Sequence, residues 1–286
     1  MKDNSRGIAW ALLAALLFAV VAAMAKLALR DFHILQILFF RQAVVFLCAL
    51  PALTLARPFR LRSQHLGLHC VRLIASFVAL SCGIWAVAVL PLTTAITLSF
   101  SHVFLGALLA MWVLKEPVDS HRIAAVLIGF TGVVVVMRPG LDHAVLAYSL
   151  IPILGALGAA VAKISVRKLS QTDTTATLLV YQSLFVGLLS GVPLFWLWQA
   201  PNVSDALFLS LIGLVATAGQ WAGIQALRYG EASVVGVIDY TKLIYAAGIG
   251  YLIFAETPDG FTLVGAVGIV GSSLYIFGRE ARRRVS

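Results

Sequence analysis

Long apolar runs recur along the whole chain, and short stretches that carry charge, Pro or Gly separate them. A helix that crosses a bilayer needs about 20 consecutive apolar residues, and these runs are of that length. The pattern predicts ten transmembrane helices, at residues 8–28, 34–56, 66–88, 92–114, 121–137, 144–166, 177–198, 204–226, 232–254 and 261–278. The predicted fold class is therefore an all-α polytopic membrane protein.

Composition excludes a water-soluble globule. Of the 286 residues 61% are hydrophobic and 12% are charged, whereas soluble domains are about 25% charged. The net charge is +9, from 21 Lys and Arg against 12 Asp and Glu, which in a soluble protein would suggest a nucleic-acid partner. A polytopic membrane protein instead gathers its cations in cytoplasmic loops, so the charge has to be tested against topology first.

The distribution of cations supports the membrane interpretation. With the amino terminus in the cytoplasm, only Arg30 and Arg138 fall in outer loops. Both termini must then be cytoplasmic, so the number of spans is even, and lipid headgroups replace nucleic acid as the expected partner of the basic surface. The predicted location is the inner membrane of a bacterial-type cell. The cations on the inner side are Lys2, Arg6, Arg57, Arg60, Arg62, Lys115, Arg122, Arg167, Lys168, Arg228, Arg279, Arg282, Arg283 and Arg284.

The two halves of the chain share a pattern at a spacing of 140 residues. The triplet Phe100-Ser101-His102 matches Tyr240-Thr241-Lys242, with an aromatic, a hydroxyl and a base in each. At the same spacing Glu116 matches Glu256 and Asp119 matches Asp259. The pattern predicts two five-helix repeats, residues 1–142 and 143–286, and an odd number of helices inverts the second repeat in the membrane.

Inverted repeats are typical of secondary transporters, which bind substrate near the bilayer midplane between the repeats. His102 and Lys242 lie near the middle of their predicted spans, so the repeat itself indicates a binding site. Gly265, Gly268 and Gly271 predict close packing of the last span, against either its repeat counterpart or a second protomer in a homodimer.

Several short patterns resemble the drug/metabolite transporter superfamily, in particular its EamA-type members. They are Phe40-Arg41-Gln42, Arg72, Leu90-Pro91-Leu92 with Ala95, Glu116-Pro117, and the pair Gly129 and Gly132. The resemblance covers nearly the whole chain and implies a ten-helix transporter with alternating access and a central cavity that commonly exports amino acids or other small metabolites. Members of the family often have Pro near the positions of His102 and Lys242. This chain has two bases there, and in this respect it resembles the aromatic amino-acid exporters of the family.

Lys242 is the first candidate for substrate binding, because an ammonium at mid-membrane costs at least about 2.5–3.5 kcal/mol and needs a partner. It would bind a carboxylate or phosphate. The alternative is a structural ion pair with Asp239 on the same helix face, and in the binding role Asp239 could hold an amino group instead. His102 could act as a proton-linked switch or a hydrogen-bond donor, or be a core histidine.

The other candidates are aromatic or polar residues inside the predicted spans. Arg41 could bind a carbonyl or seal an external gate, whereas Arg72, Lys26 and Lys163 are expected to reach the membrane faces as anchors. Aromatic rings could form a flat pocket, with two polar side chains beside them. These residues are Phe100, Tyr240, Trp221, Trp85, Tyr181 and Tyr245, with Ser99 and Gln220 as the polar contacts.

The chain has no phosphate-binding loop, no metal-ligand cluster and no motif of a hydrolytic enzyme. Cys48, Cys70 and Cys82 have no C-x-x-C spacing, so no cofactor or metal is expected. The sequence therefore predicts a secondary transporter that exports a small amphipathic metabolite, an amino acid and in particular an aromatic one. Alternatives are an exchanger of organic phosphates or other anions, in which Lys242 and Arg41 clamp phosphate, and a lipid-handling or channel-like protein.

Overall fold

The computed structural model describes residues 4–55, 66–114, 120–137, 143–169, 173, 175–230 and 232–283. All regular secondary structure in these ranges is α-helical. The helices are α1 (Asn4–Ala28), α2 (Ile34–Leu55), α3 (Leu66–Val89), α4 (Leu92–Ser99), α5 (His102–Leu114), α6 (Ser120–Met137), α7 (His143–Leu169), α8 (Thr175–Gly191), α9 (Leu194–Leu197), α10 (Val203–Tyr229), α11 (Ala232–Ile238), α12 (Thr241–Phe254) and α13 (Gly260–Arg283).

The helices coincide with the predicted spans. In the described residues, six stretches are long and apolar enough to cross a membrane: Ser5–Ala28, Ile34–Pro51, Leu66–Val89, Leu92–Leu109, Leu146–Val166 and Val203–Tyr229. Four shorter apolar stretches fall in the remaining predicted spans, at Val126–Met137, Thr177–Gly191, Thr241–Phe254 and Gly260–Ser272. The structure is thus that of an all-helical membrane protein.

One predicted boundary is wrong. The span expected at 177–198 ends early, because α8 stops at Gly191 and the short α9 follows it. Pro193 lies between the two helices; a proline has no amide hydrogen to donate and disfavours helical geometry in the residue before it. The aromatic residues of α9, Phe195 and Trp196, are more than 80% exposed, as residues of an interfacial aromatic belt are.

Two predicted spans, 92–114 and 232–254, are broken helices. The first consists of α4 and α5, and the second consists of α11 and α12. At each break the backbone hydrogen bonds join residues three apart, as in a 3₁₀ turn. The amide of Ser101 donates to the carbonyl oxygen of Leu98 and the amide of Lys242 donates to the carbonyl oxygen of Asp239, both at 3.1 Å. Apolar windows do not reveal these breaks, because the sequence on both sides of each break is apolar.

Hydroxyl groups complete the backbone hydrogen bonds at the two breaks in the same way. The Ser101 hydroxyl donates to the carbonyl oxygen of Leu98 at 2.6 Å. The Thr241 hydroxyl donates to the carbonyl oxygen of Ile238 at 2.8 Å. Both donors and both acceptors are separated by 140 residues, so the repeat predicted from the sequence extends to individual hydrogen bonds. Such bonds allow a helix to break inside a membrane.

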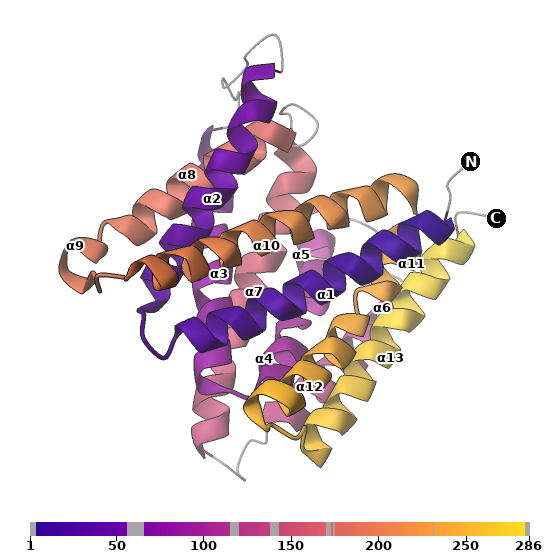
Figure 1. Ribbon diagram of the computed structural model, residues 1–286. Helices are drawn as coiled ribbons and strands as arrows, with labels where there is room; N and C mark the ends of the chain where they lie inside the picture. The colour runs from indigo at the N-terminus through magenta and orange to yellow at the C-terminus, as the bar shows by residue number, and fades with distance from the viewer. Residues whose placement is uncertain are drawn as a thin grey trace.

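Helices from the two halves pair with each other. The principal packed pairs are α1 with α10, α3 with α7, α2 with α8, and α6 with α13. Figure 1 shows α1 beside α10 along most of their length, and the start of α1 close to the end of α13. Each pair joins one helix of the first half to one of the second, so the two halves interdigitate.

Small residues allow the closest of these contacts. A Cβ atom at Gly265 would lie 2.6 Å from the carbonyl oxygen of Gly132, and a Cβ at Gly132 would lie 2.8 Å from that of Gly265. The predicted glycine packing of the last helix is therefore confirmed for Gly265 and Gly268, whose partner is α6, the repeat counterpart, whereas nothing lies within 4 Å of a Cβ at Gly271.

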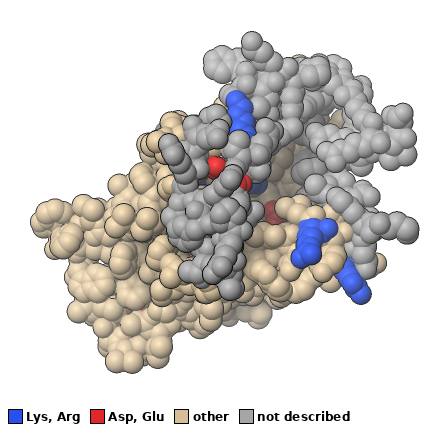
Figure 2. Space-filling view, turned by 90° about the horizontal axis from the view of Figure 1, so that it is seen from above, with Lys and Arg blue, Asp and Glu red and all other residues tan. Residues whose placement is uncertain are grey.

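The surface is suited to lipid. Large apolar side chains are exposed along several helices, for example Leu252, Val267 and Ile244, each exposed by more than 70%. In the view of Figure 2, a broad part of the described surface carries no Lys, Arg, Asp or Glu, and the visible charged side chains lie on one part of the molecule. An exposed apolar surface of this extent is unstable in water and stable in a bilayer.

Candidate substrate-binding site

A cavity of about 190 Å³ lies between the two halves of the chain. Its walls come from α1, α2, α3 and α4 of the first half and from α10 and α12 of the second. Most of the lining is apolar, with residues such as Val21, Ile37, Leu80 and Ile96. Pockets for drug-sized ligands are usually about 300–1,000 Å³, so this volume suits a smaller molecule.

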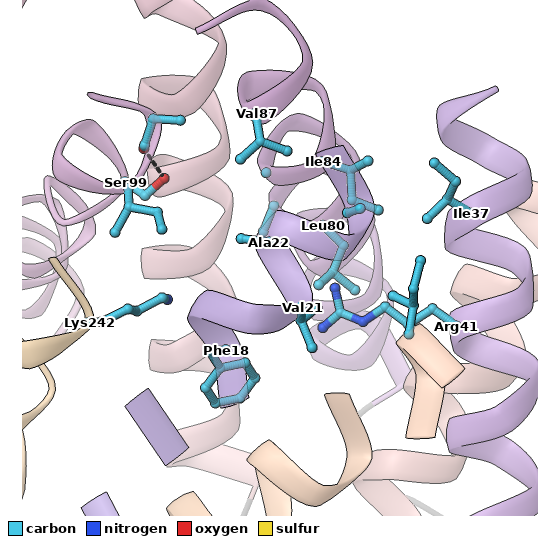
Figure 3. A pocket seen from close by; sticks show the side chains of 16 residues that line it. Phe18, Val21, Ala22, Ile37, Arg41, Leu80, Ile84, Val87, Ser99 and Lys242 are labelled. Carbon is cyan, nitrogen blue, oxygen red and sulfur yellow. Dashed lines mark hydrogen bonds between the residues drawn. The ribbon is translucent and has the colours of Figure 1, made fainter. Parts of the chain in front are cut away.

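Two cations point into this cavity from opposite halves. Arg41 comes from α2 and Lys242 from the first turn of α12, and Figure 3 shows both charged ends directed into the space between them. Of the 16 described residues that line the cavity, none is acidic. The cavity therefore has a positive potential within apolar walls, where charge interactions are stronger than in water.

The break between α11 and α12 positions Lys242. Because α12 begins at Thr241, the side chain of Lys242 leaves the helix at its first turn and enters the cavity. Its Nζ lies 5.4 Å from the ring centroid of Phe18 on α1, a cation–π contact. No ion pair joins Lys242 to Asp239 in the described residues, so the predicted structural pair is not formed in this structure.

Arg41 is held by the packing of α2 against α10. A Cβ at Gly213 on α10 would lie 2.7 Å from the Cβ of Val44 and 3.2 Å from the Cα of Arg41, so a glycine is needed at this contact. The Arg41 Nε is buried and has no hydrogen-bond partner in the described part of the chain. A buried donor without a partner is costly, so this nitrogen is suited to an acceptor that enters the cavity.

Ser99 is the polar residue that α4 contributes to the lining. Its hydroxyl donates to the carbonyl oxygen of Ala95 at 2.7 Å, as the dashed line in Figure 3 shows. The hydrogen of this hydroxyl is thus occupied, and the oxygen keeps the capacity to accept a further bond.

His102 does not line this cavity, although its repeat counterpart Lys242 does. Its Nδ1 lies 2.8 Å from the carbonyl oxygen of Ser99, and its Nε2 lies 2.7 Å from Nζ of Lys163 on α7. Asp239, at the break between α11 and α12, is half-buried and also lies outside the lining. Of the two bases that the repeat relates, the structure therefore places Lys242 in the cavity lining and His102 outside it.

Phe100 and Tyr240 pack against each other instead of forming walls of the cavity. Both are buried, and their ring centroids are 4.7 Å apart. Since the two residues are repeat counterparts, their contact joins the two breaks across the interface of the halves.

The remaining predicted aromatic and polar candidates also lie outside the lining. Trp221 is 53% exposed and packs edge-on against Trp10 with centroids 5.0 Å apart, and Trp85 is 47% exposed. Tyr181 packs against His69 at 5.1 Å. Gln220 and Tyr245 are half-buried at other places. Of the 12 predicted site residues, the cavity brings together Lys242, Arg41 and Ser99.

Lys26 is not the membrane anchor expected from its place at a helix end. Its Nζ lies 2.5 Å from a carboxylate oxygen of Glu256 and 2.9 Å from the carbonyl oxygen of Leu90. The second Glu256 oxygen accepts the amide hydrogen of Leu92 at 2.7 Å. This cluster ties α1, α4 and the segment after α12 together beside the cavity, next to its lining residue Ala25.

A second polar contact joins the halves near the start of α2. The buried side chain of Gln36 donates to the carbonyl oxygen of Gln199 at 2.7 Å and accepts the Gln199 amide hydrogen at 3.1 Å. The sequence predicted neither this contact nor the place of Phe18 in the cavity lining, because a glutamine or phenylalanine in an apolar run does not indicate its partner.

Glu116 and Asp119, the repeat counterparts of Glu256 and Asp259, lie outside the described residues.

Arg72 is also not an anchor at the membrane face. It is buried and donates to the carbonyl oxygen of Leu178 at 2.7 Å and to the Gln182 side chain at 3.3 Å. His69 on the same helix is buried, and its Nε2 lies 2.7 Å from a carboxylate oxygen of Asp173. Both residues bind α8 or the segment before it, so they are structural contacts between α3 and the second half.

Comparison with known proteins identifies the family. The model of the EamA-like transporter family matches residues 5–138 and 146–278. A riboflavin transporter of Vibrio cholerae is 32% identical over 288 residues, which cover 97% of this chain and 95% of that protein. An S-adenosylmethionine uptake transporter of Rickettsia bellii is 24% identical over 99% of this chain and 97% of its own length.

Two further matches agree with these. A pseudopaline exporter of Pseudomonas aeruginosa is 29% identical over 92% of this chain and 93% of that protein. A solved crystal structure superposes on 99% of both chains with a TM-score of 0.64 at 18% identity, which shows the same fold. The relatives carry different molecules, so the substrate has to be inferred from the cavity of this chain.

Proposed function

Because the chain belongs to the EamA-like transporter family, we propose that its central cavity binds a small amphipathic metabolite through a negatively charged group. The family makes it a multi-pass membrane protein that transports small molecules and is not an enzyme. The resemblance to EamA-type members is confirmed, whereas the finer resemblance to aromatic amino-acid exporters has no support among the relatives named above. The observation that carries the proposal is the pair of cations, Arg41 and Lys242, in an apolar cavity whose lining contains no acidic residue among those described.

The proposed topology has ten membrane-spanning helices, with α4–α5 and α11–α12 each forming one broken span. Two inverted five-helix repeats, residues 1–142 and 143–286, place both termini in the cytoplasm. The cytoplasmic excess of Lys and Arg supports this orientation, and the matched breaks support the repeat. In this orientation α1 ends on the outer side, so the cavity and the Lys26–Glu256 cluster lie in the outer half of the membrane.

Alternating access between the repeats is the mechanism that this architecture supports. Discontinuous helices at the centre of a transporter can change their packing while the rest of each repeat moves as a body. Here the two breaks meet at Phe100 and Tyr240, so a shift of one repeat moves the other broken helix as well. The Lys26–Glu256 cluster would have to open for the cavity to open fully to the outer side.

Amino acids are one class of substrate for this cavity. Their carboxylate would bind Lys242 and Arg41, whereas their ammonium would need an acceptor, for which Ser99 supplies one oxygen. Among the described lining residues Phe18 is the one aromatic ring, which gives little support to a preference for aromatic side chains. Export is the direction we propose, from the family resemblance in the sequence.

Organic phosphates or other anions are the second class, and the two cations favour them. An arginine and a lysine can share the charge of a phosphate, and the arginine can bind two of its oxygens. A lipid-handling or channel-like role has less support, because the cavity is small, about 190 Å³, and its lining brings two cations together from the two halves.

A counterflow screen in proteoliposomes tests the proposal. The panel contains amino acids, organic phosphates, riboflavin, S-adenosylmethionine and a permanently cationic compound, each with and without a pH gradient. We expect uptake of carboxylates or phosphates and no uptake of the cation. Arg41→Gln should reduce uptake of the preferred anion, whereas Arg30→Gln, a change at an exposed arginine outside the cavity, should not. Transport of the cation alone would contradict the proposal.

A further inference from the structure

A contact between two bases lies at the break of the first half. Nε2 of His102 is 2.7 Å from Nζ of Lys163, which belongs to α7. Two bases share a hydrogen bond only when one of them donates a proton that the other accepts. An ammonium group has donors and no acceptor, so the imidazole must accept, and this contact requires an unprotonated Nε2.

The other imidazole nitrogen agrees with this assignment. Nδ1 of His102 is 2.8 Å from the carbonyl oxygen of Ser99, and a carbonyl oxygen can only accept. Nδ1 therefore carries the ring hydrogen, and Nε2 carries the lone pair that Lys163 meets. Both ring nitrogens are in use, and the arrangement is specific for the neutral ring.

This imidazole connects three helices that belong to different halves. Ser99 ends α4, His102 begins α5, and Lys163 lies on α7. The helices α5 and α7 pack against each other. The protonation state of the His102 ring therefore affects the contact between α5, in the broken helix of the first half, and α7 of the second half.

The surroundings of the ring are already positive. Lys163 on α7 and Lys242 on α12 are the charged groups that face His102 in the described residues, and Asp239, after α11, faces Lys163. The side chain of Lys163 is exposed and lies near the end of the apolar stretch Leu146–Val166. A proton added to the ring would bring a third cation beside one carboxylate.

We propose that His102 and Lys163 form a proton-binding site that controls the contact between the broken helix α4–α5 and α7. A proton that adds to Nε2 of His102 turns this nitrogen from an acceptor into a donor, so the bond from Lys163 breaks and two cations repel each other. Lys163 then turns towards Asp239, and α5 separates from α7. A proton bound and released in this way would couple transport to a pH gradient.

The inference deepens the proposed transport function, but its test needs no substrate. A Cβ at Gly106 on α5 would lie 4.0 Å from the Cβ of Ala160 on α7, within the roughly 3.5–4.5 Å that a disulfide requires. The double variant Gly106→Cys/Ala160→Cys, with Cys48, Cys70 and Cys82 replaced by Ser, therefore reports on closure of α5 against α7 through its cross-linking rate.

A second cysteine pair controls for the effect of pH on thiol chemistry. The Cβ of Gln42 on α2 lies 3.6 Å from a Cβ position at Gly187 on α8, which is remote from His102 in the sequence and on other helices. We expect the rate of the α5–α7 pair, relative to this control pair, to fall by about tenfold from pH 8 to pH 5. This corresponds to about 1.4 kcal/mol in the closure equilibrium.

His102→Gln should abolish the pH dependence of the relative rate, because glutamine can accept from Lys163 and cannot take up a proton in this range. A relative rate that is independent of pH with His102 present, or one that keeps its pH dependence in His102→Gln, would overturn the proposal. If the cysteine variants do not fold, NMR of ¹⁵N-histidine in the otherwise native chain replaces them. The signal absent from His102→Gln should show the Nδ1–H form at pH 8 and a doubly protonated ring at pH 5, and a ring that stays neutral would overturn the proposal.

A negative result here leaves the anion site intact. The cross-linking and NMR measurements report on His102, whereas loss of anion counterflow in Arg41→Gln reports on the cavity. A pH-independent α5–α7 contact together with anion transport that requires Arg41 would thus remove the proton site and keep the proposed substrate class.

Discussion

The broken helix α4–α5 and the broken helix α11–α12 share their backbone and differ in what their bases contact. Both breaks have an aromatic residue, a hydroxyl and a base, and both hydroxyls donate to a carbonyl three residues before them. Lys242 points into the cavity over Phe18, whereas His102 bonds to Ser99 and Lys163. One base therefore faces the space for a ligand while its counterpart is occupied by protein.

This difference indicates how a repeated structure produces two distinct sites. Two identical halves would present the same chemical group at both breaks and would therefore form two identical sites. Here one break presents a lysine to the cavity, and the other presents an imidazole whose two nitrogens bond within the protein. We infer that the first binds the substrate and the second responds to protons.

The largest predicted effect separates the two bases. Lys242→Ala should reduce the transport of the preferred anion by about 10- to 150-fold in kcat/KM, since a hydrogen bond to a charged group is worth about 1.5–3 kcal/mol. His102→Ala should reduce it less at fixed pH, because His102 does not line the cavity. Initial rates in proteoliposomes measure both variants. Equal losses in the two would remove the functional difference between the breaks.

The contact of α6 with α13 gives the next effect, on stability. In Gly265→Ala the new methyl group would lie 2.2 Å from Val136 and 2.6 Å from the carbonyl oxygen of Gly132, so the helices must separate. Overpacking of this kind typically costs about 1–3 kcal/mol, and the melting temperature in detergent should fall.

Gly271→Ala on the same helix is the matched control for this substitution. Nothing lies within 4 Å of a Cβ at Gly271, so its melting temperature should stay the same or rise. If the two variants melt alike, the close contact between these repeat counterparts does not limit stability.

Much of this fold is predictable from the sequence, because the bilayer demands long apolar helices and the repeat spacing marks related positions. The triplets at 100–102 and 240–242 located the centre of the protein. The breaks at these triplets were not predicted, since Ser101 and Thr241 are compatible with an unbroken helix. Their hydroxyls reveal the breaks only once the carbonyl partners are known.

The candidate site was harder to predict for a physical reason. In a soluble helix polar residues mark the outer face, whereas a membrane helix is apolar on its lipid face as well as on its packed face, so mid-span position does not tell inside from outside. Trp221 and Trp85 were expected in the cavity and lie on the exposed surface. Lys26 was expected at the membrane face and binds Glu256, which is 230 residues away in the sequence.

The smallest predicted effect tests the likeness of the two breaks. Ser101→Ala and Thr241→Val each remove one hydroxyl that donates to a backbone carbonyl, and each should cost about 0.5–1.5 kcal/mol of stability. Because the two bonds are repeat-related and similar in length, 2.6 and 2.8 Å, the melting temperatures should fall by similar amounts. Their transport phenotypes should differ, since Thr241 immediately precedes Lys242 and a looser break there moves the ammonium that faces the cavity. A loss of stability confined to one variant would show that the breaks share geometry without sharing energetics.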